Sequence, residues 1–206
     1  MKLKQFFKKL FNRKATLFFL IVVIVMIAAG LLAPVIAPHD PLEQNLVMKF
    51  SMPSREYPMG TDNLGRCIFS RILYATRTTL GFSVLCTILA AIVGITLGVT
   101  AGYKGGALDM VIMRVCDVLY AFPALVLVMA IVGFIGVGIF NVVIAMLIQQ
   151  WLWYARVSRN LAAGESVKSY IAAARLCGAS DRKIIFRHIL PNIIPNMLAI
   201  FTVDFG

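Results

Sequence analysis

The sequence predicts an all-α protein, a polytopic bundle of transmembrane helices with about five spans. Of its 206 residues, 60% are hydrophobic and only 14% are charged, whereas a soluble domain carries about a quarter charged residues. The apolar residues form long windows, and a helix needs about 20 such residues to cross the hydrocarbon core. Asp204 interrupts the last of these windows, and the other four lack charged side chains. The expected spans are Leu17–Ile36, Leu80–Ala101, Val118–Gly138, Ile139–Ala155 and Ile189–Gly206.

The positive charge is placed beside the expected spans rather than spread over the chain. The net charge is +11, and the two densest groups of Lys and Arg precede the first span and follow the fourth. With four helices between them, both groups lie on one side, which the positive-inside rule makes the cytoplasm. The charge therefore predicts a cytoplasmic N-terminus and no nucleic-acid partner. The cations concerned are Lys2, Lys4, Lys8, Lys9, Arg13 and Lys14, and then Arg156, Arg159, Lys168, Arg175, Arg182, Lys183 and Arg187.

These windows divide the chain into segments. Residues 1–14 are a basic amphipathic segment for the lipid surface, or a positive flank that only sets topology. Residues 15–36 are the first span and 37–78 an extracytoplasmic loop. Residues 79–206 are the transmembrane core, with a cytoplasmic loop at 155–190.

Small residues recur every fourth position along the second expected span. Ala90, Gly94, Gly98 and Gly102 form this stripe, and small-xxx-small spacing lets two membrane helices approach closely. The stripe predicts helix packing and says nothing about a ligand.

Polar or helix-breaking residues in or beside the spans are candidates for a transport pathway or a gate. Intramembrane acids are functional candidates, but the peripheral position of Asp117 favours a pair with Arg114. Gln149 and Gln150 could face a polar pathway, but a bond to a neighbouring helix is favoured. Proline removes a backbone donor and would kink the third span. The pathway or gating candidates are Asp117, Pro123, Gln149 and Asp204.

Residues suited to catalysis or metal binding are sparse. The two His residues, 39 and 188, lie outside the expected spans, and the four Cys residues have no CxxC spacing. The chain also lacks a Gly-rich phosphate loop with Lys-Ser/Thr. We expect no enzyme activity, no metal site and no cofactor on this chain.

The loop at 155–190 predicts two short helices separated by a turn. Val167, Tyr170, Ile171 and Ala174 recur at helical spacing, which predicts an apolar face directed at a cytoplasmic partner. Gly178 suits the left-handed position that ends a helix. Ser180 or Asp181 would cap the second helix, which runs to Pro191 and into the membrane.

A helix-turn-helix that binds DNA is the alternative for this loop. Its spacing of Ala174, Gly178 and Ile184 fits that motif. The second helix, however, runs straight into an apolar span, and no third helix is available to support it.

This loop resembles the "EAA" loop of permease subunits from bacterial ABC importers. Ala173, Ala174, Gly178 and the run Ile189-Leu190-Pro191 match its pattern, and Ala172 stands where the family usually has Glu. The resemblance implies that the loop docks an ATPase subunit. The docking residues it implies are Tyr170, Ala173, Ala174, Arg175, Gly178, Asp181, Ile189 and Pro191.

A second segment is similar to the N-terminal signature of the dipeptide, oligopeptide and nickel permease group. It runs from Gly60 to Arg66 and continues with Ser70-Arg71 and Arg77, and Cys67 replaces the usual Asp. Further matches are Asp117 with Phe122-Pro123, and Trp153-Tyr154-Ala155-Arg156. Residues 75–77, 151–156 and the end around Asp204 look more like nickel permeases than dipeptide permeases.

The resemblance implies a type I ABC importer permease in the bacterial inner membrane. Such a subunit pairs with a second homologous permease, two cytoplasmic ATPase subunits that bind ATP, and an extracytoplasmic solute-binding protein. The solute implied is nickel or a metal chelate, with dipeptides or oligopeptides as the alternative.

The sequence also leaves other classes of membrane protein open. The family has six spans and this sequence has five, so a nonfunctional truncated permease is one alternative. A self-contained membrane channel is another and would work without ATPase partners. A membrane-embedded enzyme would need clustered polar residues beside the spans, but Asp117 and Asp204 are isolated.

Overall fold

The computed structural model describes the backbone of residues 14–205 and the side chains of residues 17–202. The basic segment expected over residues 1–14 and the side chain of Asp204 therefore lie outside the described part. Within that part the chain is helical, and its only extended pairing is a single antiparallel bridge between Thr61 and Cys67. This confirms the all-α class. The chain divides into two compact units, residues 1–82 and 83–206, which are described separately.

The first unit contains helices α2 (Lys14–Leu31) and α3 (Ala33–Ile36), the short helix η1 (Leu46–Met48) and the start of α4 (Ile68–Lys104). The first expected span is interrupted between α2 and α3, where Pro34 lies in the first turn of α3. The uninterrupted apolar part is Leu17–Leu31. Gly30 lies close to α4, since a Cβ there would lie 3.3 Å from the Cα of Arg77.

Asp62 organises the loop between α3 and α4. Its carboxylate accepts the backbone N–H of Leu64 at 2.8 Å and of Arg66 at 3.0 Å, and it pairs with the guanidinium groups of Arg66 and Arg71. Gly65 has φ +72°, and a Cβ there would lie 1.7 Å from the carbonyl oxygen of Asn45. The segment resembling the permease signature is thus a turn closed around one carboxylate.

The hydrogen bonds to Asp62 make this loop sensitive to acid. Burial favours the neutral form, but the two backbone N–H groups and the Arg66 guanidinium outweigh it and lower the pKa of Asp62 from 3.8 to about 2. Because the folded pKa lies below the unfolded one, its stabilisation is present above pH 3.8 and is lost as the pH falls through about 2.

We expect Asp62→Asn to open this loop at every pH, because an amide cannot accept all these bonds or neutralise two guanidinium groups. Pepsin cleavage between residues 37 and 67, followed by mass spectrometry as the pH is lowered, measures the effect. In the unmodified chain cleavage should rise only as the pH approaches 2. Glu43→Gln, in the same loop, is the matched control, and equal protection of both variants would contradict the role of Asp62.

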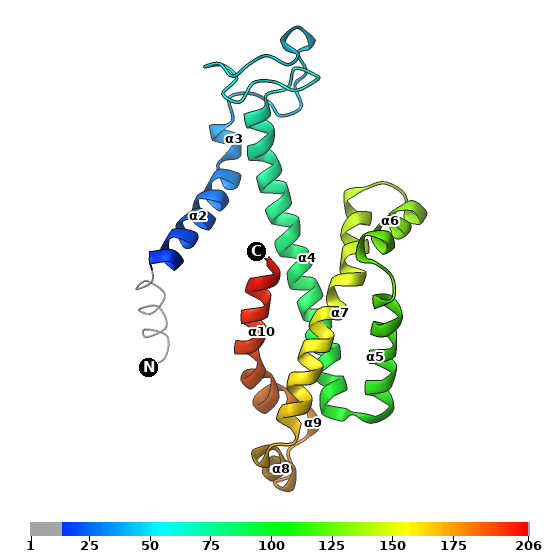
Figure 1. The fold of residues 1–206 in the computed structure, drawn as a ribbon. Coiled ribbons are helices and arrows are strands. Elements are labelled where there is room, and N and C mark those ends of the chain that lie inside the picture. Colours follow the sequence, from blue (N-terminus) through cyan, green and yellow to red (C-terminus); the bar gives the residue numbers. More distant parts are fainter. Residues whose placement is uncertain (1–13, 206) are drawn as a thin grey trace. The chain divides into compact units, whose positions relative to one another are not determined.

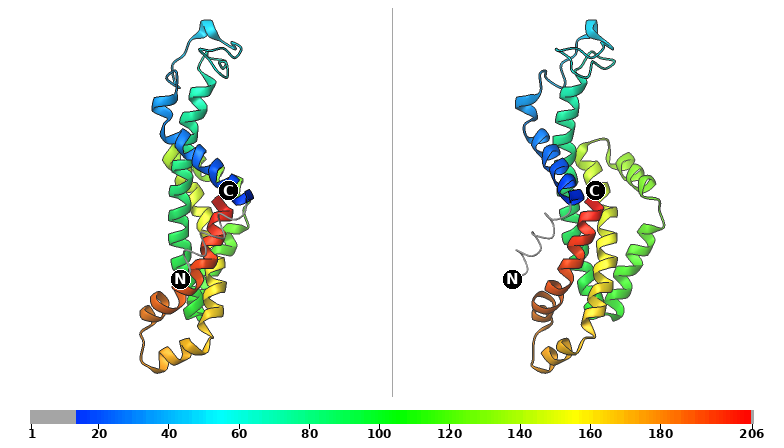
Figure 2. Two further views of the ribbon diagram at one scale, coloured as in Figure 1. Left: turned by 90° about the vertical axis from the view of Figure 1, so that its left-hand side faces the viewer. Right: turned by 60° about the vertical axis from the view of Figure 1, so that its left-hand side comes forward.

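The second unit is a set of helices that lie side by side (Figures 1 and 2). Helix α10 contacts α7, and α7 contacts α5 and α6. Helix α8 lies at the end of α7, and the chain returns through α9 into α10. Besides the rest of α4, the unit contains α5 (Gly106–Tyr120), α6 (Ala124–Ile135), α7 (Ile139–Ser166), α8 (Ser169–Leu176), α9 (Asp181–Ile184), the π-helix η2 (Ile185–Ile189) and α10 (Leu190–Phe205).

Two described helical stretches, Ile68–Lys104 and Asp181–Thr202, are long and apolar enough to cross a membrane. The pair α5 and α6 adds a third if it is counted as one span, although it bends by 88°. The third expected span, Val118–Gly138, is therefore broken. Pro123 precedes the first residue of α6, so it ends one helix and starts the next instead of kinking one. The fourth expected span lies within α7, which continues to Ser166.

The glycine stripe of α4 packs against the backbone of α7, as expected. A Cβ at Gly94 would lie 2.5 Å from the carbonyl oxygen of Trp151, and one at Gly102 would lie 2.2 Å from that of Arg159. A Cβ at Gly98 would lie 2.1 Å from Ser158 Oγ and 2.2 Å from a backbone oxygen. The two helices can approach this closely only because these positions carry no side chain.

Candidate functional site

Helix α8 is held in place by its own apolar face. Ile171 is fully buried and packs in one cluster with Ile184 and Ile189, while Ala174 is partly buried against the same cluster. For Ile171 and Ala174 the prediction that this face points at a partner is wrong, because both pack on the chain's own core, whereas Tyr170 is exposed. Val167, expected on the same face, precedes α8 and is 82% exposed.

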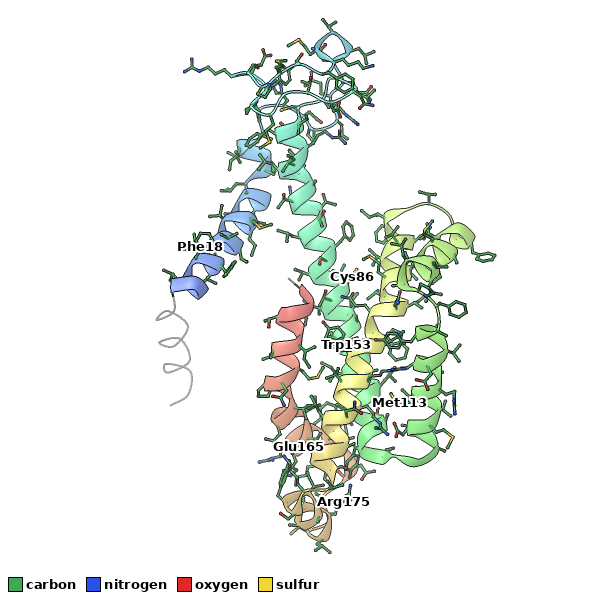
Figure 3. The ribbon with its side chains drawn as sticks, in the orientation of Figure 1. Phe18, Cys86, Met113, Trp153, Glu165 and Arg175 are labelled. Atoms are coloured by element: carbon green, nitrogen blue, oxygen red, sulfur yellow. The ribbon has the colours of Figure 1, made fainter. Side chains whose placement is uncertain are left out.

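The opposite face of α8 is open to solvent. Ala172, Ala173, Arg175 and Leu176 are exposed, and Leu176 is 90% exposed. Figure 3 marks Arg175 on this helix and Glu165 near the end of α7. A short helix with two small side chains and an exposed leucine presents a smooth apolar surface, the kind a groove on another protein can cover.

Polar contacts tie α8 and α9 to α4. The hydroxyl of Tyr103, at the end of α4, donates to Asp181 Oδ1 at 2.8 Å. The guanidinium of Arg175 lies 5.0 Å from the centre of the Tyr103 ring, a cation–π contact. Arg175 and Asp181, both expected to touch a partner, therefore meet at Tyr103, which sequence reasoning missed.

A second set of contacts ties α8 to α7 and α10. The Tyr170 hydroxyl donates to Glu165 and accepts from Asn192 Nδ2 at 2.9 Å. Lys168 also pairs with Glu165, and these bonds, first that to Lys168 and then that to Tyr170, lower the pKa of the Glu165 carboxyl. Tyr170 thus links α8 to α7 and α10 within the chain. Glu165 lies within the loop at 155–190 and Asn192 lies just after it, and this position beside the spans was the available signal.

The turn after α8 has the geometry predicted for Gly178. Its φ is +76°, its N–H donates to the carbonyl of Arg175 at 2.9 Å, and the N–H of Ala179 donates to that of Ala174 at 3.0 Å. This is a Schellman motif, in which a left-handed residue satisfies the last helical carbonyls. Among the described residues a Cβ at Gly178 would meet nothing within 4 Å, so the backbone conformation is what requires glycine here.

We expect Gly178→Ala to destabilise this turn by about 1–2 kcal/mol, the cost of a left-handed conformation for a residue with a Cβ. Gly178→Asn should cost less, since asparagine tolerates that conformation. Hydrogen exchange of the amides of Ala179 and Cys177 would measure the difference. Equal exchange in the alanine and asparagine variants would show that the conformation does not decide the turn.

The last two predicted docking residues lie where the chain enters α10. Ile189 is fully buried in the core and supports the loop from within, whereas Pro191 is exposed. A proline clashes with the carbonyl four residues before it, and the π-helix Ile185–Ile189 ends two residues before Pro191. The wider turn, in which the N–H of Leu190 donates to the carbonyl of Ile185, accommodates Pro191.

Among the described residues, no hydrogen bond or ion pair joins the pathway candidates Asp117, Pro123 and Gln149 to one another. Asp117, which is 54% exposed, pairs with Arg156 of α7 at 2.5 Å and not with Arg114, so that expectation is wrong. The reason is that α5 packs along α7, which places Arg156 opposite Asp117. Both residues belong to segments that carried the family resemblance. Pro123 lies between α5 and α6, and the side chain of Asp204 is outside the described part.

A second carboxylate of α5, Asp109, binds Arg159 of α7, so two ion pairs join these helices. Gln150 donates to Thr87 Oγ1 of α4 at 3.3 Å, the neighbouring-helix contact expected for the glutamine pair, and Gln149 is half-buried. Among the described residues no group of three or more His, Cys, Asp or Glu could hold a metal ion.

Comparison with known proteins identifies relatives over most of the chain. Residues 94–206 match the family described as binding-protein-dependent transport system inner membrane component, and residues 2–53 match the N-terminal TM domain of oligopeptide transport permease C. The first match contains the α4–α7 packing, the loop and α10.

Three curated relatives are similar to the chain. The nickel transport system permease protein NikC of Escherichia coli is 37% identical over 169 residues, which is 82% of this chain and 61% of the relative. The glutathione transport system permease protein GsiD of Pectobacterium atrosepticum is 42% identical over 154 residues, 75% of this chain and 51% of the relative. The dipeptide transport system permease protein DppC of Alkalihalophilus pseudofirmus is 34% identical over 203 residues, 98% of this chain and 67% of the relative.

The chain spans about three fifths of the length of the first of these relatives, 61% of NikC. The helical fold, the match over residues 94–206 and these relatives agree with the resemblance drawn from the two sequence motifs. The chain belongs to the family of binding-protein-dependent transport system inner membrane components.

Proposed function

We propose that this chain is a permease subunit of an ABC importer and that its α8 surface transmits the work of an ATPase subunit to the transmembrane helices. The observation that carries the proposal is that the two faces of α8 differ. One face is buried in the core with α9, η2 and α10, and the other presents Ala172, Ala173 and Leu176 to solvent. A partner that moves α8 would therefore move α10 with it.

The contacts around Tyr103 extend this coupling to α4. Tyr103 binds Asp181 and lies under Arg175, so displacement of α8 or α9 acts directly on the end of α4. The glycine stripe then joins α4 to α7. This contiguous set of packed elements is the kind of network through which a conformational change travels.

The partners follow from the same role. We infer a second homologous permease that shares the translocation path, two ATPase subunits that bind ATP on the side of α8, and a solute-binding protein on the opposite side. The positive-inside rule supports a cytoplasmic location for α8 and for the N-terminus. The chain itself carries no catalytic step and no cofactor in this proposal.

For the solute, nickel or a nickel chelate is our first candidate, and a dipeptide or oligopeptide is the second. The relative named for nickel transport favours the first candidate, and those named for glutathione and dipeptide transport favour the second. The permease defines a path, and the solute-binding protein that delivers cargo to it would select among these.

Affinity purification of the chain from its host in detergent, with mass spectrometry of what comes with it, tests the assignment. We expect ATPase subunits and a second permease, and binding of nickel or peptides by the accompanying solute-binding protein identifies the cargo. A chain that conducts ions alone in reconstituted vesicles, without these partners, would instead support a self-contained channel.

A further inference from the structure

A continuous groove with a basic end runs along α4 and α10. Its apolar part, about 350 Å³, is lined by residues that include Ile92, Ile194 and Leu198, and an adjoining part of about 370 Å³ reaches Lys104 and Arg182. The two parts share Ile95, Thr96 and Leu190. A third hollow of about 430 Å³, lined by Arg182, Lys183, Phe186, Arg187 and Ser180, continues from the basic end. We call the whole the α4–α10 groove.

The cations at this end lack partners within the described part of the chain. There, Lys104, Arg182, Lys183 and Arg187 form no ion pair, whereas Arg156, Arg159 and Lys168 each bind a carboxylate. The one carboxylate among the described lining residues, Asp181, accepts the Tyr103 hydroxyl. Four clustered positive charges with a single acid beside them attract an anion from outside the chain.

The dimensions of the groove fit one leaflet of a bilayer. From Leu190 to Phe201 helix α10 rises about 17 Å, and half of the hydrocarbon core is about 15 Å thick. Lys104 lies in the last turn of α4, where its apolar part ends, and Arg182 lines the same hollow. In a bilayer that covers the apolar part, these cations would lie at the level of the lipid headgroups. Basic pockets between membrane helices at this depth bind anionic headgroups.

We propose that the α4–α10 groove binds one anionic phospholipid, with an acyl chain along Ile92 and Leu198 and the phosphate group at Lys104, Arg182, Lys183 and Arg187. The lipid would fill the space between α4 and the loop that carries α9, and so stiffen the contact at Tyr103. The groove would bind this lipid wherever the chain is embedded in a membrane, whether or not the chain takes part in transport.

Photolabelling in lipid nanodiscs tests the proposal. The full chain is placed in phosphatidylcholine nanodiscs with a trace of phosphatidylglycerol that carries a diazirine at the end of one acyl chain. We expect adducts in residues 88–96 and 194–201 and several-fold less labelling with a phosphatidylcholine probe. Arg182→Gln/Arg187→Gln should reduce the labelling several-fold. Lys49→Gln/Arg55→Gln removes the same charge from the loop between α3 and α4 and should leave it unchanged.

A second variant tests the apolar part without changing the charge. Thr96 lines both parts of the groove and is exposed, so Thr96→Phe should fill the space and reduce labelling by the same probe. Equal labelling by the two lipid probes, or labelling unchanged in the double arginine variant, would overturn the proposal. In native membranes, a photoreactive benzoylphenylalanine in place of Leu198, which lines the apolar part and is 58% exposed, should yield lipid adducts. Adducts to a protein helix there would show that a partner subunit occupies the groove instead.

Discussion

Gly98→Val should separate α4 from α7 and disrupt the second unit. The new side chain would begin 2.1 Å from Ser158 Oγ and 2.2 Å from the carbonyl oxygen of Ala155. Since a backbone carbonyl cannot rotate away, the helices themselves must move apart. Overpacking a well-packed core costs about 1–3 kcal/mol, and a clash with backbone belongs at the upper end of that range.

The separation of the helices can be followed through the exposure of a buried thiol. Cys116 is fully buried against Leu152 and Ala155, so separation of α7 from its neighbours should expose it. In a Cys177→Ser background, maleimide labelling of Cys116 during SDS titration should occur at lower detergent in Gly98→Val. Gly81→Val is the matched control, because it lies in the same helix and a Cβ there meets nothing within 4 Å in the described part of the chain. If both variants labelled alike, close packing of the stripe would not be what holds the helices.

Ala173→Asp should abolish ATPase binding and solute uptake while the chain still inserts and folds. Ala173 is exposed on the outer face of α8, so a carboxylate there costs the chain little, but it would be left unpaired within an apolar interface. Co-purification of the ATPase subunits with the permease, and uptake by intact cells, are the measurements.

Two further variants distinguish the binding of an ATPase subunit to α8 from the attachment of α8 to the core. Val167→Asp adds the same charge to an exposed position outside α8 and should leave ATPase binding intact. Ile171→Asp puts a carboxylate into the fully buried side of α8 and should release the helix from the core, which hydrogen exchange of α8 would detect. Normal ATPase binding and uptake by Ala173→Asp would refute the proposal that α8 is the docking surface.

The ion pairs illustrate what the sequence could not decide. The motif fragments around Asp117 and Arg156 were visible as separate matches, but their contact depends on α5 packing along α7. Arg114 is nearer in sequence and lies on the same helix as Asp117, yet the carboxylate binds the guanidinium from the other helix. Proximity along the chain is a weak guide when packing brings distant charges together.

By itself the sequence determined the helical class, the close packing of α4 through Gly94, Gly98 and Gly102, and the left-handed turn at Gly178. Each of these depends on local chemistry: apolar windows, small residues at a four-residue spacing, and a backbone conformation that glycine adopts without strain. The tertiary structure alone decided which face of α8 is buried. Both faces offer small or apolar side chains, and only the position of Ile184 and Ile189 across the turn makes Ile171 the inward residue. The break at Pro123 was likewise decided by packing, because a proline can bend a helix or end it, and the surrounding contacts determine which occurs.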